Sequence, residues 1–275
     1  MPADVMQMLP LFLALVATGA VAGVVAGLLG VGGGIVVVPV LFHVLSGLGY
    51  DSATAMSVAV GTSLASLVPT AFTSARAHRA RGSVDSDLLR SWGPWILGGV
   101  AIGLVIATIA GGHALKLVFG VAALVVALHM ALSKEGFHLR DRLPSTPARQ
   151  AIATGIGGVS VMMGIGGGTL SVPILSLFNY PIKRAVGTAA AVGLIIGIPG
   201  AVGMAYAGLG AAGRPAYCLG WISLPGLLAI TPLQVLLAPY GAKIAHAVPA
   251  NLLRKLFAGF LALTAVRMLW SVLGA

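Results

Sequence analysis

Acidic residues are scarce in this chain. Only six of its 275 residues are Asp or Glu, and charged residues of both signs make up 8% of the total, whereas a soluble domain carries roughly 25%. So few charges cannot cover a water-facing surface, and 58% of the residues are hydrophobic. These proportions exclude an ordinary soluble globular protein and predict that lipid surrounds most of the molecule.

Cysteine is nearly absent as well. The single Cys218 rules out an intramolecular disulfide and a cysteine-based metal cluster, and we expect it to pack as a small apolar side chain. No two histidines share a helical metal-binding spacing with a carboxylate. The sequence therefore predicts neither a metal site nor a cofactor.

Basic residues give the chain a formal net charge of +10. In a soluble protein such an excess suggests nucleic acid, but in a membrane protein basic residues lie in loops and orient the chain. We therefore expect a lipid bilayer, and no nucleic acid, as partner. Residues 1–10 contain no Lys or Arg, so they lack the basic region of a signal peptide, and the first apolar run is expected to remain as a membrane helix.

Apolar runs separated by polar stretches predict an all-α, polytopic transmembrane protein. As one helix, residues 11–48 would be roughly 57 Å long at ~1.5 Å per residue, which is too long for one crossing of a ~30 Å hydrocarbon core. Two polar loops are expected, at 76–90 and 133–150. The expected helical segments are 11–29, 35–49, 54–75, 91–110, 114–132, 151–163, 169–178, 185–207, 219–237 and 252–271.

One stretch occurs twice. Residues 30–41 and 164–175 share seven of twelve residues, and each copy is a glycine cluster inside an apolar run with a proline five residues after its last glycine, Pro39 or Pro173. A glycine cluster breaks a helix, and in a membrane a break is tolerated where it is buried in protein or lines a wet cavity. We therefore predict a first repeat at 1–132, a cytoplasmic linker at 133–150 and a second repeat at 151–275.

The paired G-x-G-G-G-x-x-x-x-P segments are each followed by a Gly-Thr step, Gly61-Thr62-Ser63 in the first half and Gly187-Thr188-Ala189 in the second. In this combination, over about residues 11–270, the chain resembles the TauE/SafE sulfite-exporter-type permeases. The resemblance implies a membrane permease for small anions, with sulfite, a sulfonate or another organosulfur anion as substrate and with export favoured over uptake.

The distribution of basic residues favours one topology. If the second glycine segment enters the membrane and returns, almost all Lys and Arg residues lie on one side, which the positive-inside rule assigns to the cytoplasm. The two halves are then inverted repeats, each a re-entrant hairpin followed by three membrane helices, as alternating-access transporters commonly are. Both termini are expected outside the cytoplasm of an inner, plasma-membrane protein. A homodimer is left open.

The glycine breaks predict an anion site near the middle of the membrane. Interrupted helices present unpaired N–H groups and a positive dipole end, and glycine lets a ligand approach the backbone closely. Hydroxyl groups nearby could add donors, and Pro39 and Pro173 are expected to be structural, fixing the helix beyond each break. The predicted substrate-binding residues are Gly32, Gly33, Gly34, Thr62, Ser63, Gly166, Gly167, Gly168, Thr169, Ser171 and Thr188.

Other interpretations of these features stay open. Small residues also pack helices closely without any ligand, which would make the protein a membrane scaffold, and the same frame could form an anion channel. His43 could bind an anion or pack, and Arg267 could reach the interface or the cavity. The apolar runs contain no acid, which suits an anionic substrate. No nucleotide, phosphate-loop or G-x-S-x-G motif supports an enzyme.

Overall fold

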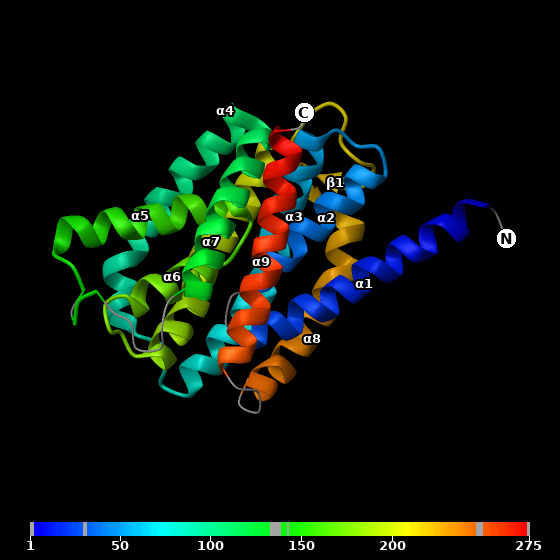
Figure 1. The fold of residues 1–275 in the computed structure, drawn as a ribbon. Coiled ribbons are helices and arrows are strands. Elements are labelled where there is room, and N and C mark those ends of the chain that lie inside the picture. Colours follow the sequence, from blue (N-terminus) through cyan, green and yellow to red (C-terminus); the bar gives the residue numbers. More distant parts are fainter. Residues whose placement is uncertain (1–2, 30–31, 133–138, 142, 246–249, 274–275) are drawn as a thin grey trace.

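The computed structural model describes residues 3–29, 32–132, 139–141, 143–245 and 250–273. Over these residues the protein is all-α apart from one short hairpin (Figure 1). The helices are α1 (Ala3–Leu29), α2 (Gly34–Gly47), α3 (Ser52–Ala80), α4 (Ser86–Leu132), α5 (Thr146–Met163), α6 (Gly168–Ser176), α7 (Ile182–Ala207), α8 (Leu224–Ala245) and α9 (Ala250–Leu273), and the strands are β1 (Cys218–Leu219) and β2 (Ile222–Ser223).

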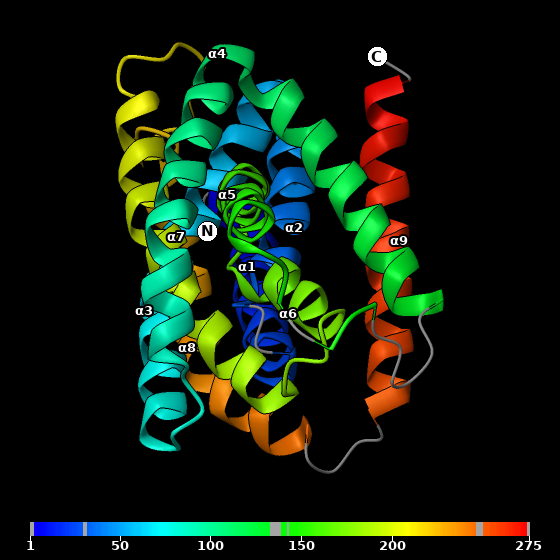
Figure 2. The same cartoon turned by 90° about the vertical axis from the view of Figure 1, so that its left-hand side faces the viewer.

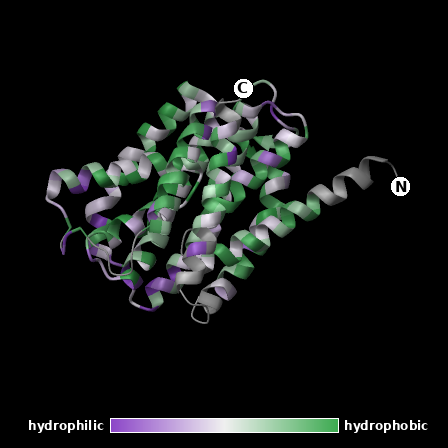
Figure 3. Cartoon of the chain, viewed as in Figure 1, coloured by the Kyte–Doolittle hydropathy of each residue, from purple (hydrophilic) through white to green (hydrophobic). Residues whose placement is uncertain are grey.

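Four helices in the described part of the chain are long and apolar enough to cross a membrane: Ser52–Ala80, Ser86–Leu132, Ile182–Ala207 and Leu224–Gly241. Shorter apolar stretches lie at Phe12–Gly27, Gly34–Gly47 and Ala258–Trp270. Hydrophilic residues gather mainly around the helix ends, and the middle of the bundle is hydrophobic (Figure 3). The prediction of a multi-pass helical membrane protein is confirmed at this level.

Helix α4 is bent back on itself at Gly111, whose φ of 67° and ψ of −169° are not helical. Its two segments correspond to the helical segments predicted at 91–110 and 114–132, and they run in opposite directions (Figure 2). A Cβ at Gly112 would lie 1.9 Å from the carbonyl oxygen of Ala53, so the absence of a side chain lets the bend press against the start of α3.

Helices α3 and α7 pack against each other and run antiparallel. Cβ atoms added at Gly193 and Gly200 would lie 3.2 Å from Ala71 and Leu64 respectively. The contacts thus progress along the two helices in opposite directions. Close glycine contacts of this kind bring helices together in a membrane. The hydrophobic effect does not drive helices to associate there, because lipid tails are as apolar as the side chains.

The first helix of each half packs on a helix of the other half. Helix α1 packs on α8, where Gly23 lies against the backbone of Gln234. Helix α5 packs on the first segment of α4, where Gly157 lies against the backbone of Ile96. Each half of the sequence therefore packs its first helix against a helix of the other half.

Two predicted loops were too long. Helices α3 and α4 extend through most of residues 76–90, leaving 81–85 between them, and α5 begins at Thr146 inside the predicted linker. Polar residues continue a helix beyond the apolar core until a cap ends it. Here the Asp85 carboxylate accepts hydrogen bonds from the amides of Asp87 and Leu88 and thereby starts α4.

The segment predicted as a helix from residue 219 begins instead as a β-hairpin. Strand β1 pairs with β2 around Gly220 and Trp221, and Gly220 has a φ of 56°. A Cβ on Gly220 would lie 1.7 Å from the carbonyl oxygen of Ala205. The hairpin therefore folds back onto the end of α7, and α8 starts five residues later than predicted.

Candidate functional site

The first helix break lies between α1 and α2. Gly32 and Gly33 both have left-handed backbones, with φ of 73° and 74°, which side chains other than glycine rarely allow. Space is limiting as well, because a Cβ on Gly33 would lie 2.7 Å from Gln234 Nε2 and 2.8 Å from the carbonyl oxygen of Ala22. Sterics thus require glycine at this break.

The second break lies between α5 and α6. Gly164 ends α5 with a φ of 68°, and its amide donates back into the last helical turn. A Cβ there would lie 2.9 Å from Cα of Val60. Helix α6 starts four residues later, at Gly168. The predicted interruption is confirmed in both halves, although residues 30–31 lie outside the described residues.

The two breaks meet at the centre of the molecule. A Cβ on Gly34 would lie 2.5 Å from the carbonyl oxygen of Gly164, and one on Gly32 would lie 3.9 Å from Cα of Gly166. The N-termini of α2 and α6 therefore come together, each with amides that the helix itself cannot pair and with the positive end of its dipole. This places donors from both halves at one point.

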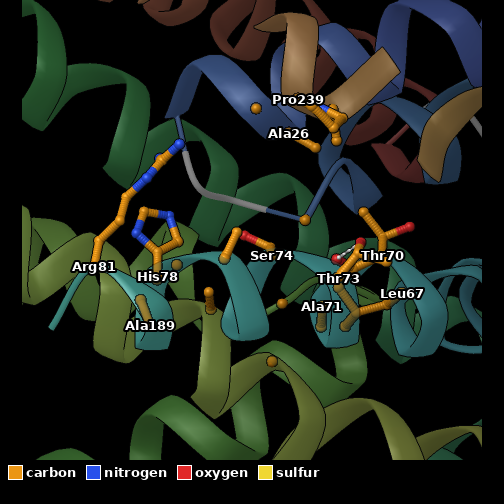
Figure 4. A pocket seen from close by; sticks show the side chains of 18 residues that line it. Ala26, Leu67, Thr70, Ala71, Thr73, Ser74, His78, Arg81, Ala189 and Pro239 are labelled. Atoms are coloured by element: carbon orange, nitrogen blue, oxygen red, sulfur yellow. Dashed lines mark hydrogen bonds between the residues drawn. The ribbon is translucent and has the colours of Figure 1, made fainter. Parts of the chain in front are cut away.

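A cavity of about 200 Å³ opens beside these breaks (Figure 4). Three predicted site residues, Gly32, Gly166 and Gly168, contribute to its wall. The remaining wall is formed mainly by α3 and α7, with a smaller part from α1 and α8. Those other residues are Ala26, Gly27, Leu67, Thr70, Ala71, Thr73, Ser74, Ala77, His78, Arg81, Ala189, Ala190, Gly193, Ala238 and Pro239.

The charge of the wall is positive. Arg81 and His78 line the cavity where α3 ends, and both point toward the first break (Figure 4). None of the described residues that line it carries a carboxylate. The hydroxyl groups of Thr70 and Thr73 are bonded within α3, to the carbonyl oxygens of Ser66 and Pro69. The cavity can therefore attract an anion through Arg81 and offer it main-chain amides.

Three of the predicted hydroxyl groups serve helix packing. Thr62 Oγ1 accepts a hydrogen bond from the amide of Ser223, Thr188 Oγ1 accepts one from the amide of Asp85, and Ser63 Oγ donates to the carbonyl oxygen of Gly164. All three side chains lie off the cavity wall. Each ties a helix of one half to a loop or break of the other.

The other two hydroxyl groups are buried beside the second break. Thr169 is 2% exposed and Ser171 is 1% exposed, and neither hydroxyl has a partner within the described residues. Ser171 lines a second, smaller hollow between α4, α6 and α7, together with Thr188 and Trp92. Neither Thr169 nor Ser171 lines the main cavity.

The remaining predicted residues support the breaks from behind. Gly33, Gly34 and Gly167 lie off the cavity wall, and a Cβ on Gly167 would lie 2.3 Å from Val192. Pro39 and Pro173 are each the sixth residue of the helix that follows a break. A proline there removes one amide from the helix ladder and fixes the local φ, in keeping with a structural role.

Sequence reasoning missed three residues. His78 and Arg81 were assigned to a solvated loop, because the length of α3 was underestimated. Gln234 is completely buried, and its Nε2 donates to the carbonyl oxygen of Gly32 over 2.9 Å. A lone amide side chain in an apolar helix was the available signal for it. In contrast, His43 and Arg267 are exposed on α2 and α9, away from the cavity.

Known proteins are similar to this chain over nearly its whole length. The family profile described as "Sulfite exporter TauE/SafE" matches residues 15–268. A probable membrane transporter protein of Haemophilus influenzae is 35% identical over 91% of this chain and 95% of its own. A second, from Methanocaldococcus jannaschii, is 27% identical over 97% of both chains, and YunE of Bacillus subtilis, also described as a probable membrane transporter protein, is 31% identical over 64% of this chain and 72% of its own.

No solved structure matches the chain. The family profile and the Haemophilus relative each cover more than nine-tenths of the sequence, and the residues matched by the profile include both glycine breaks and every residue that lines the cavity. The chain therefore belongs to the TauE/SafE sulfite exporter family of membrane transporters.

Proposed function

We propose that this protein is a permease for small anions, with sulfite, a sulfonate or another organosulfur anion as its substrate class. The observation that carries the proposal is the cavity of about 200 Å³ whose wall joins both glycine breaks to Arg81. The sulfur class comes from the family description, "Sulfite exporter TauE/SafE". The same description favours export.

The chemistry of the wall supports an anion in preference to a cation. Unpaired amides at the starts of α2 and α6 donate hydrogen bonds, and the oxygens of a sulfite or sulfonate group accept several at once. Gly32, Gly166 and Gly168 carry no side chain that would keep an anion from the backbone. Arg81 adds a full positive charge at the end of α3. The volume suits a solute of a few heavy atoms.

We further propose that the two halves are inverted repeats that exchange conformations in alternating access. Two pairs of contacts support a two-fold relation. Gly61 and Thr62 of α3 contact the segment from Trp221 to Ser223, and Gly187 and Thr188 of α7 contact the segment from Ser83 to Asp85. In each half, the Gly-Thr step thus contacts the residues that immediately precede a helix of the opposite half. That helix is α8 for the first step and α4 for the second.

The proposed repeats are residues 1–132 and 151–275, joined by a cytoplasmic linker at 133–150. In this arrangement the end of the molecule where α3 stops and α7 starts faces the cytoplasm of an inner-membrane protein, and both termini face the other side. The basic residues Arg76, Arg79, Arg81, Lys183 and Arg184 near that end support this orientation under the positive-inside rule.

Flux measurements on purified protein in liposomes test the function. We expect saturable uptake of sulfite or methanesulfonate, with counterflow, because a carrier exchanges bound substrate across the membrane. Ala190→Phe should abolish this flux by filling the cavity, whereas Ala101→Phe, at an exposed position on α4, should leave it unchanged. Large unitary currents would point to a channel, and the absence of flux for every anion tested would overturn the proposal.

A further inference from the structure

We propose that each glycine break is held in shape by a side chain from the opposite half: Gln234 of α8 holds the first break, and Ser63 of α3 holds the second. Both are then positioning residues for the anion cavity, and this role rests on the proposed function. The two hydrogen bonds that carry the inference cross between the halves, because α8 follows the second break in the chain and α3 follows the first.

The first bond joins a completely buried amide to the cavity wall. Gln234 Nε2 donates to the carbonyl oxygen of Gly32 over 2.9 Å, and the same nitrogen lies 2.7 Å from the position of a Cβ on Gly33. Gly32 lines the cavity. The Gln234 amide therefore sits on the left-handed peptide that turns the chain from α1 into α2.

The second bond is also buried. Ser63 Oγ donates to the carbonyl oxygen of Gly164 over 2.6 Å, and it lies 2.9 Å from the position of a Cβ on Gly34. Gly164 is the left-handed residue that ends α5. The Ser63 hydroxyl group thus bonds to the second break, whereas it only fills the space where a side chain on Gly34 of the first break would lie.

A matched contact shows that packing alone does not require an amide at position 234. Gly157 of α5 lies against the backbone of Ile96 in the same way that Gly23 of α1 lies against the backbone of Gln234. An apolar side chain serves the α4–α5 contact, since Ile96 is completely buried. The amide at the α1–α8 contact therefore serves the bond to Gly32.

The unpaired half of the amide leads to the same conclusion. Gln234 Oε1 is buried and has no partner within the described residues, and a buried acceptor without a partner is unfavourable. For packing alone, an apolar residue of the same length would be the better choice. The bond from Nε2 to Gly32 gives a reason for glutamine that outweighs this disadvantage.

Hydrogen exchange tests the crossed arrangement without any transport assay. We expect Gln234→Met to speed exchange of the Val36 and Val37 amides, which donate to the carbonyl oxygen of Gly33, about tenfold, the effect of losing one buried hydrogen bond. The hydrogen-bonded amides of Gly164, Ile165 and Ser171 at the second break should be unchanged. Ser63→Ala should do the reverse. Equal effects at both breaks, or effects only within the half that carries the substitution, would overturn the proposal. Ile96→Met is the matched control and should alter neither break.

Transport by Gln234→Glu provides a second, chemical test. A buried carboxyl group stays protonated to a higher pH than usual, and its O–H can then donate to Gly32 in place of the amide. With methanesulfonate, whose charge does not change with pH, we expect near-normal KM in acid and a rise of about tenfold as the pH increases and the proton is lost. Gln234→Met should show the raised KM at every pH.

His78 and Arg81 line the same cavity and are unchanged in these variants, so the wild-type pH profile is the reference for the Glu variant. A profile for Gln234→Glu that parallels the wild type would overturn the positioning role. If the wild type moves no anion but the exchange pattern is crossed as expected, the proposed function fails and the crossed support of the breaks stands.

Discussion

Gly33 combines two requirements that only a glycine can meet. Its φ of 74° is left-handed, and the space where a Cβ would lie is filled by Gln234 and by the Ala22 carbonyl group. At most other positions only one of these conditions applies. This residue should therefore be much more sensitive to substitution than glycines that only bring helices close together.

We expect Gly33→Ala to lower the free energy of unfolding by about 2–5 kcal/mol, because the left-handed backbone costs ~1–2 kcal/mol with a side chain and the clash adds ~1–3 kcal/mol. Gly47 is the last residue of α2 and has an ordinary backbone. Apart from its own helix, no described part of the chain lies within 4 Å of its Cβ position. Gly47→Ala is thus the control and should be neutral or slightly stabilising. Thermal unfolding in detergent checks both, and equal melting temperatures would contradict the expectation.

Under the proposed function, the charge of Arg81 attracts the anion to the cavity that this residue lines. We expect Arg81→Gln to raise KM for the anion about threefold and to weaken the dependence of KM on salt, with Vmax little changed, because a partly screened charge affects capture more than the later steps. Arg79→Gln is the control, since Arg79 is exposed near the same helix end but does not line the cavity. Identical KM values for both variants would argue against capture by Arg81.

At the scale of helices, one junction joins the two halves at the basic end. The Asp85 carboxylate accepts a hydrogen bond from the Tyr180 hydroxyl and pairs with Arg184 at 3.0 Å. Although burial would raise the pKa of Asp85, the hydrogen bonds from Tyr180 and the Leu88 amide, together with Arg184, hold it below its usual value. Burial, together with the hydrogen bond to Asp85 and the charge of that carboxylate, raises the pKa of Tyr180, although Arg184 acts in the opposite direction.

A carboxyl group with a lowered pKa stabilises the fold above its unfolded pKa and loses that contribution as the pH falls through the folded value. We therefore expect wild-type stability to fall in acid below about pH 4. Asp85→Asn should be less stable at neutral pH by about 1–2 kcal/mol and should show a smaller fall in acid. Melting temperatures from pH 7 to 3 measure this, with Asp87→Asn, at an exposed position, as control.

At the scale of the whole molecule, the proposed orientation can be tested by labelling. Ser86 is the first residue of α4, at the basic end. Ala212 lies beyond the end of α7, at the opposite end, and both residues are exposed. In a Cys218→Ser background, we expect an impermeant thiol reagent added to intact cells to label Ala212→Cys and not Ser86→Cys. The reverse pattern would invert the topology.

Cys218 is replaced in that experiment although its thiol is a weak target. The side chain is half-buried, and burial raises the pKa of the thiol above its usual value, which lowers the fraction of reactive thiolate. Its expected role as a small packing residue agrees with this position beside the β-hairpin.

The sequence by itself determined the class of the protein. The shortage of charge and the long apolar runs require lipid as solvent, and two glycine clusters in matched places require two interrupted helices, because glycine is the residue that tolerates the left-handed turns at Gly33 and Gly164. These are local or compositional properties, so they can be derived without coordinates. The ends of helices in polar stretches could not be derived in this way, because capping contacts such as those of Asp85 decide where a helix begins.

Only the tertiary structure decided which residues surround the cavity. Thr62, Ser63 and Thr188 fit a substrate site by residue type, yet their hydroxyl groups bind backbone of the opposite half. Arg81 and Gln234 come to the breaks through the packing of α3 and α8, which are distant from at least one break in sequence. A side chain's partner depends on how helices from the two halves cross, and no pattern within one helix contains that information.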